Sequence, residues 1–314
     1  MKKKQKKLTV LLPIYKEPNN FVELAINSIL NQTFNDFYLY IILDDPTNER
    51  LIKLVNEYTA IDDRIIFEVN EKNLGLPLTL NKMLEKVETE YIARMDADDI
   101  AKDDRFEKQY NYMKENDDVD LCGTNIIYID NDGNQIHKKQ SLPENNDEIR
   151  KTLSYLDVLC HPTFFAKSKV LKKVRYRNLK YAQDYDLVCR LEEKKYILAN
   201  INEYLLNYRT GNVGAKKMLE QRITAGEIQR FYRKQRLCEI DISKIVSDKV
   251  LKLNEKSINN YKKSCDIYET GVVLIKKHNY VKGISIIIIS LLHSKYQVEN
   301  FFNMIKYKLC IKKF

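Results

Sequence analysis

An acidic cluster, Asp96-Ala97-Asp98-Asp99, follows directly after the β-branched and aromatic run at 91–95. Carboxylates at a strand end can hold a hard cation, because Mg²⁺ and Mn²⁺ prefer oxygen ligands and share them with water and diphosphate. The cluster therefore predicts nucleotide-diphosphate chemistry. A solvated acidic turn or helix start has the same residues, so the neighbouring segments must decide between these readings.

Short apolar runs alternate with helical patterns through the first half of the chain. This alternation is typical of βαβ units and predicts an α/β fold, a mostly parallel sheet flanked by helices. The predicted strands are 8–12, 38–43, 65–69, 91–95 and 121–129, and the predicted helices are 20–32, 50–58, 77–87 and 105–115. Pro13 is expected to end the first strand, and Asn131-Asp132-Gly133 is expected to form a hairpin turn.

Acidic residues recur where these strands end. Ligands of open parallel sheets bind outside the carboxyl ends of the strands, so Asp45 and Asp98 should converge on one crevice. A sugar-nucleotide pyrophosphorylase would need a glycine-rich loop after the first strand, and residues 12–17 contain no glycine. A calcium-binding EF-hand is disfavoured because Ile100 and Ala101 stand where the pattern needs Asp or Asn and then Gly.

The basic charge is concentrated in the last third of the chain. Residues 215–314 contain 21 Lys and Arg against 9 Asp and Glu, although the whole chain has a net charge of only +9. This excess indicates either an anionic surface nearby, such as a membrane leaflet or a polyphosphate, or a lysine-rich composition without a partner. We place a domain boundary near Gly214, with a catalytic domain at 1–214 and a lysine-rich helical region at 215–314.

Two apolar segments of the helical region could contact a membrane without crossing it. Ile284–Leu292 has roughly half of the ~20 residues that a transmembrane helix needs, so we expect a buried or interfacial helix. Residues 301–313 form either an amphipathic tail on anionic lipid or a helix docked on the catalytic domain. The scattered cysteines show no C-x-x-C pair, and no apolar segment follows the N-terminal lysines, so we expect a cytoplasmic protein without a signal peptide.

Eight further motifs occur in a fixed order along the first two thirds of the chain. They are residues 10–17 (VLLPIYKE), 28–33 (SILNQT), 44–45 (DD), 94–99 (RMDADD), 105–109 (RFEKQ), 161–162 (HP), 183–187 (QDYDL) and 208–209 (YR). This series resembles the family 2 glycosyltransferases with the GT-A fold, of the bacterial surface-polysaccharide type. The resemblance implies that fold, followed by a C-terminal helical extension.

The resemblance also implies a site for a nucleotide-sugar. Tyr15 would stack on the nucleobase, and Asp45 would accept a hydrogen bond from the uracil imide, which favours a UDP-sugar. Asp98 would bind the metal, Mn²⁺ or Mg²⁺, while Asp96 would lie closer to the ribose and donor sugar. The implied nucleotide-sugar-binding residues are Pro13, Tyr15, Glu17, Asp45, Asn73, Gly75, Arg94, Asp96 and Asp98. Arg94 offers either a cationic contact or an ion pair with the neighbouring aspartates.

The resemblance implies Asp184 as the general base, because transfer with inversion needs one carboxylate to deprotonate the acceptor hydroxyl. Asp184 could instead cap the helix that follows it. Asp186 and Arg190 are spaced for a salt bridge within that helix. His161 matches a family position near the acceptor, but a histidine before proline is often only exposed or packed.

These assignments imply an inverting glycosyltransferase, of the hexosyl or N-acetylhexosaminyl type. It would move a sugar from a UDP-sugar to a hydroxyl of a lipid-linked or cell-surface glycan acceptor. We expect it in the cytoplasm, with peripheral contact between the C-terminal region and the anionic inner face of the membrane, and without a nucleic-acid partner. The alternative is a sugar-nucleotide-binding or polyanion-binding protein without transferase activity.

Overall fold

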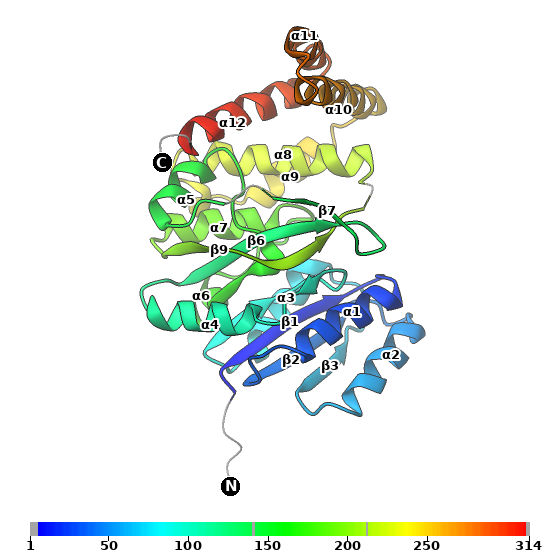
Figure 1. Cartoon of the computed structure of the whole chain (residues 1–314), viewed down its shortest axis with the longest axis vertical. Helices are drawn as coiled ribbons and strands as arrows, with labels where there is room; N and C mark the ends of the chain where they lie inside the picture. Colours follow the sequence, from blue (N-terminus) through cyan, green and yellow to red (C-terminus); the bar gives the residue numbers. More distant parts are fainter. Residues whose placement is uncertain (1–5, 140–141, 212, 312–314) are drawn as a thin grey trace. The chain divides into compact units, whose positions relative to one another are not determined.

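The computed structural model describes residues 6–139, 142–211 and 213–311, which divide into two compact units (Figure 1). The first unit consists of Met1–Arg150 and Asp157–Gly211, and the second consists of Lys151–Leu156 and Asn212–Phe314. Two lysines of the expected amphipathic tail, at 312 and 313, lie outside the described residues.

Within the described residues, nine strands of the first unit form one mixed sheet, in the order β3-β2-β1-β4-β8-β6-β9-β5 with β7 beside β6. The strands are β1 (Leu8–Ile14), β2 (Phe37–Leu43), β3 (Ile65–Val69), β4 (Tyr91–Arg94), β5 (Ile100–Ala101), β6 (Leu121–Ile129), β7 (Gln135–Lys138), β8 (Phe165–Lys167) and β9 (Leu198–Arg209). The first four are parallel, as predicted, while β8, β5 and β7 add antiparallel pairs. The predicted hairpin turn joins β6 to β7, and Gly133 in it has a φ of 86°.

One prediction about β1 is wrong, because Pro13 does not end the strand. Pro13 pairs with Ile42 of β2, and β1 continues to Ile14. On its other side, β1 pairs with β4 only as far as Leu11. Proline lacks a backbone N–H and is tolerated where a strand edge has no partner, so Pro13 fits beyond the end of the β4 pairing.

Helices cover the sheet of the first unit. They are α1 (Asn19–Leu30), α2 (Glu49–Thr59), α3 (Leu76–Lys86), α4 (Arg105–Glu115), α6 (Ser168–Val174) and α7 (Gln183–Glu193), while α5 (Asn146–Leu153) belongs to this unit only as far as Arg150. One apolar core joins alternate residues of β1 to the buried faces of α1, α2 and α4. Strands buried in this way read as nearly continuous apolar runs, which is why 8–12 and 38–43 are recognisable in the sequence.

The second unit is helical, as the composition predicts. Its helices are α8 (Ala215–Tyr232), α9 (Ile242–Val250), α10 (Glu255–Lys276), α11 (Tyr280–Leu291) and α12 (Lys295–Ile311). Leu219, Ile223 and Tyr261 form a small apolar core between α8 and α10. Among the helices in the described part of the chain, none combines the length and apolar composition needed to cross a membrane.

Candidate functional site

The loop that follows β1 lines a cavity at the carboxyl ends of the parallel strands. Pro13, Tyr15 and Glu17 contribute to its wall together with Asn73 and Gly75, and its volume is about 380 Å³. Glu17 Oε2 accepts a hydrogen bond from Tyr15 N at 2.7 Å, which holds the loop in a tight turn. The Tyr15 side chain is 40% exposed. An exposed aromatic ring at a cavity can stack on a planar base.

Asp44 holds the loop on the other side of this cavity. Its Oδ1 accepts hydrogen bonds from Leu74 N at 2.8 Å and Asn70 Nδ2 at 2.7 Å, and its Oδ2 accepts one from Gly75 N at 2.8 Å. Gly75 has a φ of 81°, in the left-handed region that glycine adopts without a steric penalty. The buried Asp44 carboxylate and this glycine therefore fix the shape of the cavity wall.

Asp45 is placed differently from its neighbour. It is absent from the residues that line the cavity in the described part of the chain, whereas Asp44 lines it. The Asp45 carboxylate accepts hydrogen bonds from Thr47 Oγ1 at 2.7 Å and Thr47 N at 3.1 Å, which lower its pKa with help from Lys16. The structure thus does not bring Asp45 into the cavity with the other predicted nucleotide-sugar-binding residues.

The neighbouring aspartates should differ in their effect on stability. Replacing Asp44 with alanine is expected to lower the free energy of unfolding by about 2–3 kcal/mol, because two backbone N–H groups and one amide lose their acceptor. Chemical denaturation of the purified chain measures this change. Asp45→Ala is the matched control and should leave the denaturation midpoint unchanged; equal midpoints for the two variants would contradict the anchoring role of Asp44.

The acidic cluster lies immediately after β4. Asp96, Asp98 and Asp99 bring carboxylate oxygens within 4.8 Å of one another. Arg209, at the end of β9, fixes this loop: its backbone N donates to Asp99 Oδ1 at 2.8 Å and its Nε donates to Asp98 O at 2.8 Å. Asp99 is buried, and its Oδ2 has no hydrogen-bond partner among the described residues.

The electrostatics of this cluster favour a cation. Burial raises the pKa of Asp98 to about 6, and the charges of Asp96 and Glu17 add to this effect. The pKa of Asp99 lies well above its usual value for the same reasons, with Asp96 and Asp98 as the charged neighbours. A divalent cation would relieve the repulsion between these carboxylates, so the residues present fit a metal ion.

Arg94, at the end of β4, pairs with the cluster from the other side. It is buried and forms an ion pair with Asp96, so the predicted pairing with a neighbouring aspartate is confirmed. Arg105 Nη2 donates to Arg94 O at 2.8 Å and fixes the backbone there. Arg94 Nε and Nη1 have no hydrogen-bond partner among the described residues.

A second cavity, of about 330 Å³, adjoins the first, because Asp96 and Leu76 line both. Several titratable side chains from distant segments meet in its wall. They are Arg94, Asp96, Lys139, Asp157, Cys160, His161, Asp184 and Tyr208. The two cavities and the acidic cluster therefore lie next to one another in the first unit.

Two carboxylates of the second cavity, Asp157 and Asp184, influence each other. Burial raises the pKa of Asp157 to about 8, and the charge of Asp184 contributes to this rise. Burial also raises the pKa of Asp184, but the backbone N–H of Tyr185 and the charge of Arg94 oppose it. Near neutral pH Asp157 therefore favours its protonated form, while the N–H of Tyr185 and the charge of Arg94 favour the ionised form of Asp184.

His161 belongs to the wall of the second cavity. Its Nε2 lies 2.9 Å from the hydroxyl oxygen of Tyr176, and its ring packs edge-on against Phe164. Burial, assisted by Arg94, lowers the pKa of His161 well below its usual value. The imidazole is therefore neutral and acts as a polar wall residue.

Asp184 reaches the cavity from the first turn of α7. The N-cap of this helix is Ala182, with a φ of 52° and no side-chain capping bond, so the alternative of Asp184 as the helix cap is wrong. A cap position requires the residue that precedes the first turn, and Asp184 lies two residues further along. Its carboxylate is instead directed to the cavity wall.

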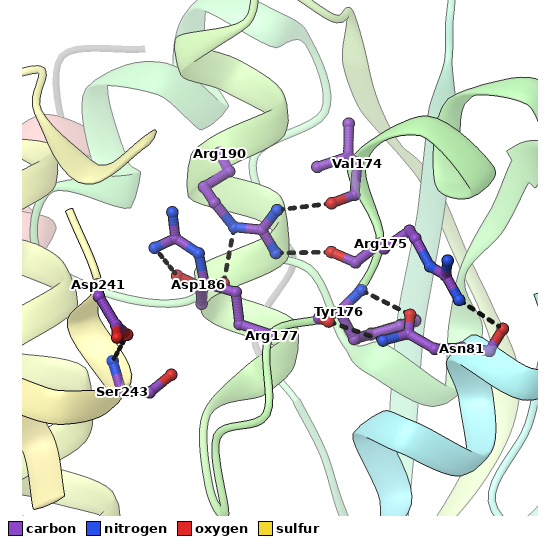
Figure 2. A network of polar contacts seen from close by, with 9 residues as sticks. All are labelled: Asn81, Val174, Arg175, Tyr176, Arg177, Asp186, Arg190, Asp241 and Ser243. Atoms are coloured by element: carbon purple, nitrogen blue, oxygen red, sulfur yellow. Dashed lines mark hydrogen bonds and ion pairs between the residues drawn. The ribbon is translucent and has the colours of Figure 1, made fainter. Parts of the chain in front are cut away.

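Figure 2 shows the polar contacts that hold α7 in place. Arg190 Nε donates to Asp186 Oδ2 at 2.7 Å, which confirms the predicted salt bridge within the helix. The same guanidinium donates to both backbone carbonyls of residues 174–175, at 2.9 and 2.8 Å. Asn81 of α3 binds the backbone of Tyr176 twice. Its Oδ1 accepts a hydrogen bond from Tyr176 N at 2.9 Å, and its Nδ2 donates one to Tyr176 O at 2.8 Å.

The structure gathers most of the predicted residues into this site. The residues that line the first cavity, the second cavity or both are Pro13, Tyr15, Glu17, Asn73, Gly75, Arg94, Asp96 and Asp184. Asp98 joins them through the acidic cluster, and Asp45 lies outside both walls.

Sequence reasoning missed Asp157, Lys139 and the anchoring role of Asp44. The sequence held a signal for Asp44, because this residue is the first of two carboxylates and directly follows the buried strand β2. The sequence held no such signal for Asp157 and Lys139. Each lies in an irregular segment, and only the tertiary structure places it in the same cavity wall as Asp184.

The fold and the site define an α/β protein with a ligand cleft at the carboxyl ends of its strands. The family model for glycosyl transferase family 2 matches residues 9–175, and the chain belongs to this family. It is 39% identical to an uncharacterized glycosyltransferase of Methanocaldococcus jannaschii over 65% of this chain and 71% of that protein. It is 35% identical to the O-antigen biosynthesis glycosyltransferase WbnJ of Escherichia coli, over 67% of this chain and 82% of that protein.

Solved structures share the fold and confirm the predicted GT-A architecture. S. aureus TarS, solved in complex with UDP, has a TM-score of 0.56 at 16% identity, covering 94% of this chain and 90% of that chain. The mannosyltransferase PcManGT of Pyrobaculum calidifontis, in complex with GDP-Man and Mn²⁺, has a TM-score of 0.58 at 11% identity, covering 99% and 87%. The match to glycosyl transferase family 2, and not these structures, gives the reaction class of this protein, glycosyl transfer.

Proposed function

We propose that this protein is an inverting glycosyltransferase that moves a sugar from a UDP-sugar to a hydroxyl of a lipid-linked or cell-surface glycan. The observation that carries the proposal is that the two cavities adjoin and share Asp96 in their walls. Direct transfer requires the attacking oxygen and the anomeric carbon to approach within about 3–3.5 Å. A donor in the first cavity and an acceptor in the second would meet beside Asp96.

In this proposal the first cavity binds the nucleotide. The exposed Tyr15 ring would stack on the base, and Asn73 and Gly75 would flank the donor. Asp45 would reach the uracil imide from the rim of the cavity, after giving up its contacts with Thr47. The UDP bound to S. aureus TarS supports a uridine donor, although PcManGT is in complex with GDP-Man.

The proposed reaction is a single displacement. Asp184 accepts the proton of the acceptor hydroxyl, the oxygen forms a bond to the anomeric carbon, and the bond from that carbon to the diphosphate oxygen breaks. The bonding electron pair leaves with UDP, and attack from the opposite face inverts the configuration. The backbone N–H of Tyr185 and the charge of Arg94 favour the ionised form of Asp184 that this role needs.

The acidic cluster would hold a divalent cation, Mn²⁺ or Mg²⁺, through Asp98, with Asp99 and Asp96 beside it. When bound, such a cation neutralises the charge of a diphosphate leaving group as a Lewis acid. The Mn²⁺ in the PcManGT complex supports this assignment. Arg94 and Arg209 hold the carboxylates and their loop in place through the contacts described above.

A screen of nucleotide-sugars tests the donor. The full chain is mixed with UDP-sugars and GDP-sugars, each with and without Mn²⁺, and the released nucleotide is measured. UDP release is expected to be faster than GDP release. Tyr15→Ala should raise the dissociation constant of UDP by about 5- to 100-fold, because stacking on an aromatic ring contributes about 1–3 kcal/mol per base.

Tyr15→Phe is the matched control and should bind UDP as the wild type does, since it keeps the ring. Faster release of GDP would contradict the uridine assignment. UDP binding without hydrolysis or transfer from any UDP-sugar would favour the alternative, a sugar-nucleotide-binding protein without transferase activity.

A further inference from the structure

The short helix α11 exposes aliphatic side chains along one face. Val281, Ile284, Ile288, Ile289 and Leu292, here called the outer face of α11, are 82%, 51%, 56%, 47% and 81% exposed. Isolated exposed aliphatic residues are common, but five that are neighbours on one helix form a continuous apolar patch. Such patches mark surfaces that contact another molecule.

The opposite face of α11 is already packed against α10. Gly283, Ile287 and Ser290 are buried there. A Cβ atom at Gly271 of α10 would lie 2.9 Å from Gly283 O and 2.7 Å from Ile287 Cγ1, so the two helix backbones touch. Ser264 Oγ also donates to Ser290 O at 2.7 Å. The two helices α10 and α11 are therefore held together tightly, and α11 cannot turn its outer face inward without losing these contacts.

The chain segment that contains α11 carries charge of one sign. Residues 270–298 contain no Asp or Glu, and they contain four lysines at 276, 277, 282 and 295. All four are exposed. Three lie before or at the start of α11 and one lies beyond its end, so cationic side chains flank the apolar patch at both ends. A partner with a negatively charged surface and an apolar interior would complement this pattern.

We propose that the outer face of α11 docks on the surface of an anionic lipid bilayer. The helix has 12 residues and is about 18 Å long, which suits a helix that lies parallel to the bilayer. Its aliphatic side chains enter the boundary between headgroups and acyl chains, while the flanking lysines contact lipid phosphates. A second copy of the chain is a poorer occupant, because it would bring the lysines of both copies together.

This docking deepens the proposed function, since it places the enzyme where a lipid-linked acceptor would lie. Only this link to the acceptor rests on the proposed function. The sequence left a lipid contact open at two segments, 284–292 as a buried or interfacial helix and 301–313 as an amphipathic tail or a docked helix. In α12, however, Asn303 and Tyr307 are buried, so that helix has a packed face. The larger share of exposed aliphatic side chains lies on α11.

Co-sedimentation of the full chain with lipid vesicles tests the proposal. The vesicles contain phosphatidylcholine alone or equal parts phosphatidylcholine and phosphatidylglycerol. Binding is expected only to the anionic vesicles. The double variant Val281→Asp/Ile288→Asp should bind them at least about 10-fold more weakly, because two inserted aliphatic side chains are lost. Lys276→Gln/Lys277→Gln should weaken binding about 5-fold per lysine at low salt.

Ile61→Asp is the matched control, because Ile61 is an aliphatic residue of the first unit that is 79% exposed. It should bind vesicles as the wild type does, and circular dichroism checks that every variant is folded. Equal binding by the wild type and the double variant would overturn the proposal. A second result would also overturn it. In that case neither protein binds vesicles, and sedimentation velocity shows a dimer for the wild type but not for the double variant.

Vesicle binding is measured without donor or acceptor, so it is independent of the glycosyl-transfer proposal. Hydrolysis of the donor in the absence of vesicles should be the same for the wild type and the double variant. If the double variant loses vesicle binding and keeps donor hydrolysis, the result therefore supports docking by α11 and leaves the proposed function untouched. Intact vesicle binding in a protein that hydrolyses no UDP-sugar would instead refute the proposed function and keep the docking.

Discussion

Replacing Asp184 with asparagine is expected to lower the rate of sugar transfer by about 10²- to 10⁴-fold, the usual contribution of a general base. The amide cannot accept the proton of the acceptor hydroxyl, yet it matches the carboxylate in shape. Donor binding should change little, because Asp184 lines the second cavity and not the first. Steady-state transfer from a UDP-sugar and titration with UDP measure the two quantities separately.

Asp157→Asn is the matched control for this variant. Asp157 lines the same cavity, but its pKa of about 8 keeps it protonated near neutral pH, so an amide imitates its resting form. Its transfer rate at pH 7 should stay within about threefold of the wild type. If Asp157→Asn lost activity while Asp184→Asn kept it, the general base would be Asp157.

The pH dependence gives a second test of the base. A base must be deprotonated to act, so the transfer rate should rise with pH through the pKa of Asp184. Burial raises that pKa, which places the acidic limb of the profile above the ordinary range of an aspartate. Asp157→Asn should keep the same acidic limb and differ from the wild type only near and above pH 8, where Asp157 ionises.

Replacing Asp98 with alanine is expected to lower kcat/KM for transfer by about 10²- to 10³-fold in the presence of Mn²⁺. The variant loses a metal ligand, and charge neutralisation by a bound cation contributes several kcal/mol, with each tenfold in rate equal to about 1.4 kcal/mol. Chelation of divalent ions should reduce wild-type transfer by a similar factor and should have little further effect on the variant.

Binding of Mn²⁺, followed by calorimetry, gives a readout that does not depend on activity. Asp98→Ala should weaken it, whereas Asp103→Ala should not, because Asp103 is an exposed carboxylate in the loop before α4 and outside the acidic cluster. Unchanged Mn²⁺ affinity in Asp98→Ala would place the cation elsewhere. Full activity of the wild type after chelation would remove the metal from the mechanism and leave glycosyl transfer standing.

The parallel half of the sheet was predictable because β1, β2 and β4 are buried along nearly their whole length, although β3 at the end of the sheet is partly exposed. The boundaries of β3, α4 and β6 agree with the sequence patterns, that of β2 differs by one residue at one end, and those of α2 and α3 differ by one residue at each end. The antiparallel half was not predictable in the same way. Strands β5 and β8 have two and three residues, too few to show a period, and their partners β9, β4 and β6 are distant in the chain.

The candidate site was likewise predictable in part from the sequence. Asp96, Asp98 and Tyr15 follow strand ends, and a parallel sheet brings such residues to one edge whatever the details of packing. The sequence does not separate Asp44 from Asp45, because both are carboxylates in one turn. Burial separates them, since only Asp44 is close enough to the 73–75 loop to bind its backbone.

By itself, the sequence of this protein determined the α/β architecture and the edge of the sheet where the candidate site lies, and its motif series indicated the family. The architecture and the site follow from apolar periodicity and from residue types at strand ends, which are local properties. Only the tertiary structure decided that Asp157 lies beside Asp184 and that α11 turns its aliphatic face outward. Protonation and exposure depend on neighbours distant in the chain, and no local pattern encodes those neighbours.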